Sequence, residues 1–419
     1  MSSQTARATG DAMLEGKGEL ASATKRLLLV GGAGVPELEQ AIARRGWRAL
    51  MMTYPETIGA AAVTETIEHV ETADFARPAG VVRRIAALRA ANAIERVVSV
   101  TEFGLLPAAI ATAQLGLPGP ATRAVRDTRD KLRMRRVLAE AGLGQVRHAA
   151  CRDLDEARRF LDEIGGPIVV KPVSGSGSDG VSRVAGADQL DAAFTLAAGA
   201  AGFMGLLCEE YVDGAEVSLE GYSLAGRFVP ITLTDKITDE RFLEIGHQQP
   251  SGQPPEVFEA VTEYASRALT ALGVTDGVTH SEFRLAARGP VLIETHTRMG
   301  GGNLHVLTRL TTGVDLADLM VAFGLGESPD VRPVPQGRGA AVRFLVGRPG
   351  RIAGVVAPPA TSADGVHALK LPDPGRTVTG RSASQERLGY VITTGATAEA
   401  AGRAAEDFAA RIRIHYEGD

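Results

Sequence analysis

The chain has 419 residues, of which 44% are hydrophobic and 23% charged, and its formal net charge is −5 at pH 7. This length exceeds what one hydrophobic core supports and predicts two to four domains. The mixed, slightly acidic charge argues against a nucleic-acid-binding protein, which would present a strongly basic face. No apolar run approaches the ~20 residues of a membrane helix. Two cysteines are too few for a disulfide framework and favour the reducing cytoplasm.

The first quarter of the chain predicts a tail followed by a Rossmann-like domain. Residues 1–25 are rich in Ser, Ala, Gly and charge, without the apolar segment of a secretion signal, and predict a flexible tail. An apolar run at 26–30, a Gly-rich turn, a helix at 36–46 and a strand at 47–54 form a predicted βαβ unit. The glycines miss the G-x-G-x-x-G spacing, and the ribose-binding acid is missing, so NAD is not expected.

Two charged residues in the next stretch, Glu102 and Lys131, lie at positions that favour a role in binding. Glu102 follows a predicted parallel strand, at the sheet edge where α/β proteins bind ligands; a solvated loop acid is the alternative. A helix is predicted over 127–142 with Asp127 or Thr128 as its cap. Lys131 then lies in its first turn, where the helix dipole disfavours a cation.

A strand lysine followed by a Gly- and Ser-rich loop predicts a phosphate-binding lid. Lys171 ends the apolar strand, and the loop lacks the Walker A pattern. Alternating glycines let backbone N–H groups approach phosphate oxygens and also provide a hinge; a merely flexible loop is the alternative. The loop residues concerned are Ser174, Gly175, Ser176, Gly177, Ser178 and Gly180.

Residues 206–250 predict an antiparallel sheet and a long polar loop. The strand at 206–212 would present its Glu209–Val212 end as an edge able to bind an adenine ring. Glu216 and Glu220 alternate onto one face of the next strand. The polar loop contains Lys236 and His247, and long loops in compact domains are usually functional or disordered.

A hairpin at 277–298 carries the most informative pattern. Glu282 and Glu294 lie on its two strands and would repel each other unless a cation lay between them. Hard oxygen ligands in such a pair suit Mg²⁺, which shares its other positions with water and phosphate. His296 and Arg298 share the face of Glu294, and a guanidinium there could offset phosphoryl charge. An exposed hairpin with scattered surface charges is the alternative.

The order of these features along the chain, from Lys131 through the Gly-rich loop to the hairpin acids and Arg298, resembles that of the ATP-grasp superfamily. The resemblance is specifically to its carboxylate–amine ligase branch and to the L-amino-acid ligases within it. The resemblance implies an α/β fold, α+β in part: the ATP-grasp fold with a Rossmann-like pre-ATP domain, a mobile lid, an antiparallel-sheet nucleotide domain and a small C-terminal α/β cap. The expected ranges are 1–25 for the tail, 26–125 for the pre-ATP domain, 126–336 for the ATP-grasp domain with its lid at about 165–206, and 337–419 for the cap.

The resemblance also assigns roles to residues. Arg298 is expected to be catalytic, and Glu282 and Glu294 to hold Mg²⁺ or Mn²⁺. ATP is expected to bind at Lys131, Lys171, the loop residues Ser174, Gly175, Ser176, Gly177, Ser178 and Gly180, the hinge Glu209, Glu210, Tyr211 and Val212, and Glu216. Substrate contacts are expected from Glu102, Lys236, His247, His296, Gly301 and Asn303. Many relatives have Asn where this chain has His296, and a carboxamide oxygen is the better Mg²⁺ ligand, so His296 is expected to be a metal neighbour or a substrate contact.

The expected function is an ATP- and Mg²⁺-dependent ligase that joins two amino acids, of dipeptide or γ-glutamyl type, through an acyl-phosphate. A homodimer is compatible with this family, and neither a membrane nor a nucleic-acid partner is expected. The alternatives are a small-molecule kinase, a carboxylase and an ATP-binding protein without catalysis.

Overall fold

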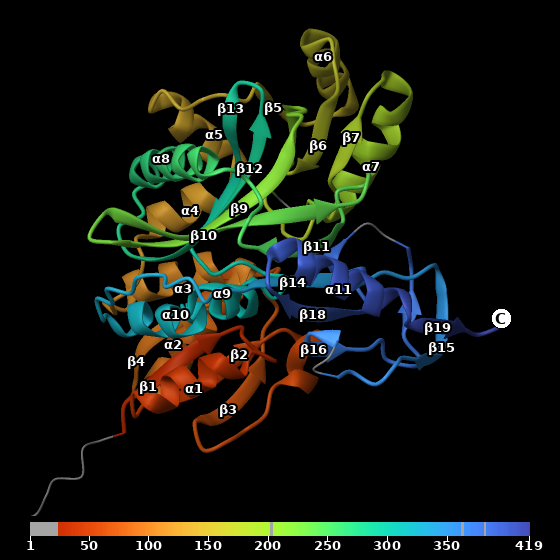
Figure 1. The fold of residues 1–419 in the computed structure, drawn as a ribbon. Helices are drawn as coiled ribbons and strands as arrows, with labels where there is room; N and C mark the ends of the chain where they lie inside the picture. Colours follow the sequence, from red (N-terminus) through yellow and green to blue (C-terminus); the bar gives the residue numbers. More distant parts are fainter. Residues whose placement is uncertain (1–23, 202–203, 362–363, 381–382) are drawn as a thin grey trace, which may run out of the picture.

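The computed structural model describes residues 24–201, 204–361, 364–380 and 383–419. The tail predicted for residues 1–25 lies almost wholly outside this part. No helix of the described part has the length and apolar character needed to cross a bilayer. Three sheets organise the site: a parallel N-terminal sheet, a long antiparallel sheet, and the small sheet of the lid (Figure 1).

The N-terminal sheet is wholly parallel, as the βαβ pattern predicts, and its strand order is β3-β2-β1-β4. Its strands are β1 (Arg26–Val30), β2 (Arg48–Thr53), β3 (Ile67–Thr72) and β4 (Ile94–Ser99). The helices that cover it are α1 (Pro36–Arg44), α2 (Pro78–Asn92), α3 (Glu102–Gln114) and α10 (Leu316–Leu325). Strand β3, which opens with a single buried residue, was not predicted. The continuous apolar run of β1 is buried on both faces because helices cover both.

Helix α10 joins the N-terminal sheet to the rest of the molecule. Its apolar side chains share one buried cluster with α1 and β1 on one side and with Tyr222 and Val278 of the long sheet on the other. Asp318 of α10 also pairs with Arg44 and Arg45 of α1. This packing places the carboxyl end of β4, and therefore Glu102, beside the long sheet.

The long sheet has eight strands in the order β13-β12-β9-β10-β11-β14-β18-β16, and all neighbours pair antiparallel. Its strands are β9 (Ala215–Leu224), β10 (Arg227–Thr238), β11 (Glu244–Gln249), β12 (Gly277–Ala286), β13 (Gly289–His296), β14 (Gly339–Leu345), β16 (Val366–Lys370) and β18 (Gly389–Gly395). Helices α8 (Pro255–Ala271) and α9 (Leu304–Thr312) pack on it.

One expectation about this sheet is corrected. The segment expected as a long polar loop is a hairpin, because β10 continues to Thr238 and β11 begins at Glu244. Lys236 and His247 are therefore strand residues, paired directly across β10 and β11. Strand β14 pairs with β11, so the expected cap continues the long sheet. The domain boundaries themselves stay a prediction.

The lid is a four-stranded sheet with the order β5-β8-β6-β7, packed on two helices. Its elements are β5 (His148–Cys151), α6 (Leu154–Ile164), β6 (Ile168–Pro172), β7 (Ser182–Val184), α7 (Leu190–Ala200) and β8 (Leu206–Glu210). Strand β8 lies inside this sheet, and the backbone of Glu209 pairs on both sides. The expected open edge at Glu209 is therefore wrong, although Tyr211 and Val212 follow the strand.

The helix expected over 127–142 is two helices, α4 (Thr122–Arg129) and α5 (Lys131–Glu140). The cap of α5 is Asp130, whose carboxylate accepts the Arg133 N–H, and not Asp127 or Thr128. Lys131 is the first residue of α5. In the C-terminal region, β15 (Gly350–Val356) forms a small sheet with β17 (Thr377–Val378) and β19 (Arg413–Tyr416). Helix α11 (Ala398–Ala410) ends shortly before β19.

Candidate active site

The hairpin β12–β13 forms as predicted, and Glu282 is the direct cross-strand partner of Glu294. Partners in an antiparallel pair project from the same face, so both carboxylates lie at one cleft between the lid and the long sheet. A register shift next to Glu282 leaves Ile293 without a partner, and Arg135 of α5 donates to the carbonyls of Leu292 and Ile293 there. The strand irregularity is thereby tied to α5.

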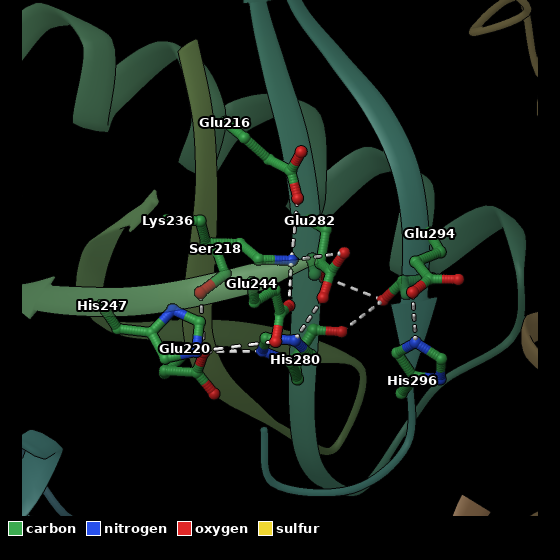
Figure 2. Close-up of polar contacts among 12 residues, drawn as sticks. Glu216, Ser218, Glu220, Lys236, Glu244, His247, His280, Glu282, Glu294 and His296 are labelled. Atoms are coloured by element: carbon green, nitrogen blue, oxygen red, sulfur yellow. Dashed lines mark hydrogen bonds and ion pairs between the residues drawn. The ribbon is translucent and has the colours of Figure 1, made fainter. Parts of the chain in front are cut away.

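Lys236 forms ion pairs with three carboxylates at the floor of the cleft. Its ammonium lies 2.9 Å from Glu216, 2.7 Å from Glu244 and 2.8 Å from Glu282, as Figure 2 shows. Burial alone would lower the pKa of Lys236, but the three carboxylates hold it well above its usual value. Burial would raise the pKa of Glu282; Lys236 lowers it to about 2 despite the repulsion of Glu294.

Lys131 forms an ion pair with the second acid of the hairpin, Glu294. Its ammonium lies 2.6 Å from Glu294, and it is almost wholly buried. Burial opposes the charged form of Lys131, but Glu294 raises its pKa. The position at the start of α5, unfavourable with respect to the helix dipole, is therefore offset by this carboxylate. Both carboxylates are ionised, and each faces an ammonium rather than its neighbour.

A histidine stands behind each acid, and the two imidazoles belong to one cross-strand pair. His280 lies between Glu220, at 2.6 Å, and Glu282, at 3.0 Å. Burial would lower the pKa of His280, but these carboxylates raise it to about 10. His296 lies 2.9 Å from Glu102 and 3.4 Å from Glu294. The two rings stack with centroids 6.0 Å apart.

Glu102 connects the N-terminal domain to the site. Its buried carboxylate accepts from Arg298 at 2.8 Å and from Arg129 at 3.1 Å, and it also faces His296. Burial would raise the pKa of Glu102, yet these cations hold it well below its usual range. Arg129 also donates to the Ser174 hydroxyl at 3.2 Å. The expected catalytic guanidinium is thus held by a residue from another domain.

The lid contributes Lys171 and its glycine loop to the same cleft. Lys171 lies 2.6 Å from Glu209, which also accepts from Arg135 at 2.6 Å. In the loop, Gly177, Ser178 and Gly180 have φ of 67°, 60° and 75°, a region in which only glycine is unstrained. The predicted residues that line the cleft are Lys131, Lys171, Gly175, Ser176, Gly177, Ser178, Glu209, Glu210, Tyr211, Val212, Glu216, Lys236, Glu282 and Glu294.

Other predicted substrate contacts lie at the margin of this cluster. His247 is buried, lies 3.7 Å from Glu244, and burial lowers its pKa to about 3, so the ring is neutral. Its Nδ1 has no hydrogen-bond partner among the described residues. Gly301 faces open space, and Asn303 precedes α9 at a φ of 63°. The substrate roles of these residues stay predictions.

Several residues of the site were not predicted as such. They are Arg129, Arg135, Glu220, Glu244, His280 and Arg387. His280 carries a local signal, since it shares the period-2 face of Glu282, and Arg135 follows Lys131 by one helical turn. Arg129 and Arg387 have no such signal because their partners are distant in sequence, and Glu244 lies in the segment that was expected to be a loop.

The two carboxylates fit a divalent cation whose remaining ligands are phosphate oxygens and water. Glu282 and Glu294 supply hard oxygen atoms from one face, as Mg²⁺ requires. Among the described residues, no group of three or more His, Cys, Asp or Glu side chains is arranged to hold a metal alone. Two carboxylates beside two lysines therefore suit an ion that arrives with a polyphosphate. His296, held between Glu102 and Glu294, is oriented as a support for Glu294.

Comparisons with known proteins agree with this geometry. Family models described as ATP-grasp domain, L-amino acid ligase C-terminal domain 2 and ATP-grasp N-terminal domain match residues 164–305, 343–417 and 41–119. Alanine–anticapsin ligase of Bacillus subtilis (strain 168) is 28% identical over 243 residues, 52% of each chain. Human carnosine synthase 1 is 27% identical over 350 residues, 77% of this chain and 42% of that protein.

The first of these relatives is matched over about half of its own length. Among solved structures, an L-amino acid ligase from Bacillus licheniformis superimposes with a TM-score of 0.80 at 20% identity, over 94% of this chain and 99% of that chain. Phosphoribosylglycinamide synthetase from Anaerococcus prevotii gives 0.71 at 17% identity, over 94% and 100%. These structures share the fold over 94% of this chain.

Proposed function

As the chain belongs to the ATP-grasp superfamily, we propose that it is an ATP-dependent ligase that forms an amide bond between two amino acids. The observation that carries this proposal is the pair Glu282 and Glu294, directly opposed at the floor of the cleft and flanked by Lys236 and Lys131. Relatives named alanine–anticapsin ligase and L-amino acid ligase support amino acids as the substrate class.

In the proposed reaction a carboxylate oxygen attacks the γ-phosphorus of ATP, and the bond to ADP breaks. The nitrogen of an amine then attacks the acyl carbon, phosphate leaves, and the ammonium group loses a proton. Glu282 and Glu294 would hold Mg²⁺, which supplies positive charge to the phosphates when bound. Lys131 and Lys171 would contact the same phosphates, because both ammonium groups line the cleft.

Arg298 would stabilise the charge on the acyl group. Its Nε donates to Glu102, and one of its other N–H groups donates to the Met299 carbonyl. The remaining N–H groups of the guanidinium are left for a ligand. The glycine loop would close over the phosphates and keep water from the acyl-phosphate. The pairing of Glu102 with Arg298 therefore couples the N-terminal domain to the reacting groups.

A screen of phosphate release tests this function. ATP, Mg²⁺ and the protein are incubated with the twenty amino acids singly and in pairs, and products are identified by mass spectrometry. We expect release that requires one particular pair, together with a product of the mass of a dipeptide. A phosphorylated product formed without an amine would show a kinase. No ADP formation with any pair would favour an ATP-binding protein without catalysis.

A further inference from the structure

A short segment of the C-terminal region, Ser384–Arg387, reaches the nucleotide cleft at two points. The first contact is with the lid loop: the Ser384 N–H donates to the Gly177 carbonyl at 2.9 Å. The approach is close, because a Cβ on Gly177 would lie 2.9 Å from the Cβ of Ser384. The phosphate loop is therefore fastened, in this conformation, to a part of the chain some 200 residues away.

The second contact is with the charge cluster at the floor. Arg387 Nε donates to the Glu244 carbonyl at 3.0 Å, and its guanidinium pairs with the Glu244 carboxylate. The guanidinium also lies 3.9 Å from the centre of the Phe344 ring. Glu244 in turn holds Lys236 at 2.7 Å, and Lys236 holds Glu282 at 2.8 Å. Arg387 is thus connected to a proposed metal acid through three successive ion pairs.

Glu386 and Leu388 anchor the C-terminal side of the segment, so it acts as a fixed arm. The Glu386 carboxylate accepts the N–H groups of Thr379 and Gly380 at 2.8 and 3.3 Å. The Leu388 N–H donates to the Leu345 carbonyl at 2.8 Å, and the Leu388 side chain is buried in the C-terminal core. Because this arm contacts both the lid loop and the floor of the cleft, it fixes the position of the loop relative to the floor.

We propose that Ser384–Arg387 is a latch, which holds the phosphate loop closed and positions Glu244 and Lys236. As a consequence, the amine and not water attacks the acyl-phosphate. This inference rests on the proposed ligase function. With the latch closed, the amine nitrogen attacks the acyl carbon and phosphate leaves. With the latch open, a water oxygen attacks the same carbon. The free carboxylate and phosphate then form, and ATP is consumed without an amide. Arg387 is a positioning residue.

The phosphate-to-amide ratio distinguishes a latch from a merely structural contact. A loss of folded enzyme lowers both products in proportion and leaves their ratio near one. For Arg387→Ala we expect the ratio to rise about tenfold, on the scale of losing one charge-assisted hydrogen bond. Arg387→Lys keeps the charge and is expected to restore part of the coupling. Arg351→Ala removes an exposed arginine of the same region, paired with Glu417, and is the matched control.

The contact with the lid can be removed at the backbone alone. Ser384→Pro deletes the N–H donor, and the local conformation accepts proline. Ser384 begins a 3-10 turn, and Ala383 before it has φ −149° and ψ 147°, as residues preceding proline prefer. Ser384→Ala keeps the N–H and is the matched control. We expect Ser384→Pro, but not Ser384→Ala, to raise the phosphate-to-amide ratio.

A second measurement does not depend on the identity of the amino-acid substrates. Hydrogen–deuterium exchange of residues 174–181 is followed with the full chain and MgATP. Ser384→Pro is expected to exchange faster there than Ser384→Ala, while exchange in the N-terminal sheet stays equal. If the parent protein forms no amide with any pair, the proposed function fails, and this exchange still decides whether the latch exists. Equal exchange in the two variants, or an unchanged ratio in Arg387→Ala, would overturn the latch.

Discussion

Glu282 lies directly opposite Glu294 across the β12–β13 pair, yet each carboxylate is paired with a different lysine. Like charges placed directly opposite on a sheet are destabilising. Lys236 and Lys131 offset this repulsion, and His280, whose pKa is raised to about 10, adds a further cationic support behind Glu282. The site is therefore a pair of acids held ionised and aimed at one cleft in advance of a cation and phosphates.

The first prediction concerns the acids. Glu282→Gln and Glu294→Gln each remove one hard oxygen ligand and should lower the apparent Mg²⁺ affinity at least ~10-fold. The measurement is ADP formation as a function of Mg²⁺ at fixed ATP. Glu256→Gln, at an exposed position of α8, is the control for a simple change of charge. An unchanged Mg²⁺ dependence in both variants would remove the metal role.

Lys236 is expected to matter for stability as well as for turnover. Lys236→Met leaves three buried or half-buried carboxylates without their shared cation, and breaking such a cluster costs ~3–5 kcal/mol of unfolding free energy. Urea denaturation with and without Mg²⁺ measures this. Mg²⁺ should stabilise the variant more than the parent, because the ion can replace part of the missing charge. Arg227→Met, exposed on the same strand, should differ little from the parent in both conditions.

Arg298→Ala should separate ATP binding from turnover. The guanidinium is held by Glu102 and not by the residues expected at the nucleotide, so the ATP dissociation constant should change little. Turnover should fall by ~10²-fold or more, as for other groups that stabilise developing charge. Equilibrium ATP binding and phosphate release on the same preparations test this. Product formation at the parental rate would show that Arg298 is not catalytic.

The pH dependence of stability should report on Glu209. Burial would raise the pKa of this carboxyl, but Arg135 and Lys171 lower it from 4.5 to about 2. Its stabilising contribution, ~3 kcal/mol, is therefore fully present above pH 4.5 and is lost as the pH falls through 2. In Glu209→Gln this contribution should be absent, while that of Glu282, whose pKa is also lowered to about 2, should remain. Urea unfolding of both proteins between pH 2 and 7 tests it, and parallel curves would contradict the assignment.

The sequence by itself determined the local elements that bear the chemistry. Period-2 alternation places Glu282 and Glu294 on the two strands of one hairpin. The register set by the turn would place Ile293 opposite Glu282, so the two acids face the same side because of the strand irregularity between Glu282 and Phe283. The strand lysine Lys171 and the glycine loop after it are equally local. These predictions succeed because neighbours in sequence remain neighbours in space.

Only the tertiary structure decided which charges meet. Lys236 was expected in a loop, but β10 continues through it and carries it under Glu216 and Glu282. Glu102 reaches Arg298 because α10 docks the N-terminal sheet on the long sheet, and Arg387 reaches Glu244 because β14 extends that sheet. A buried charge is stable only beside a partner, and here the partners lie up to some 200 residues apart, beyond the reach of any local pattern.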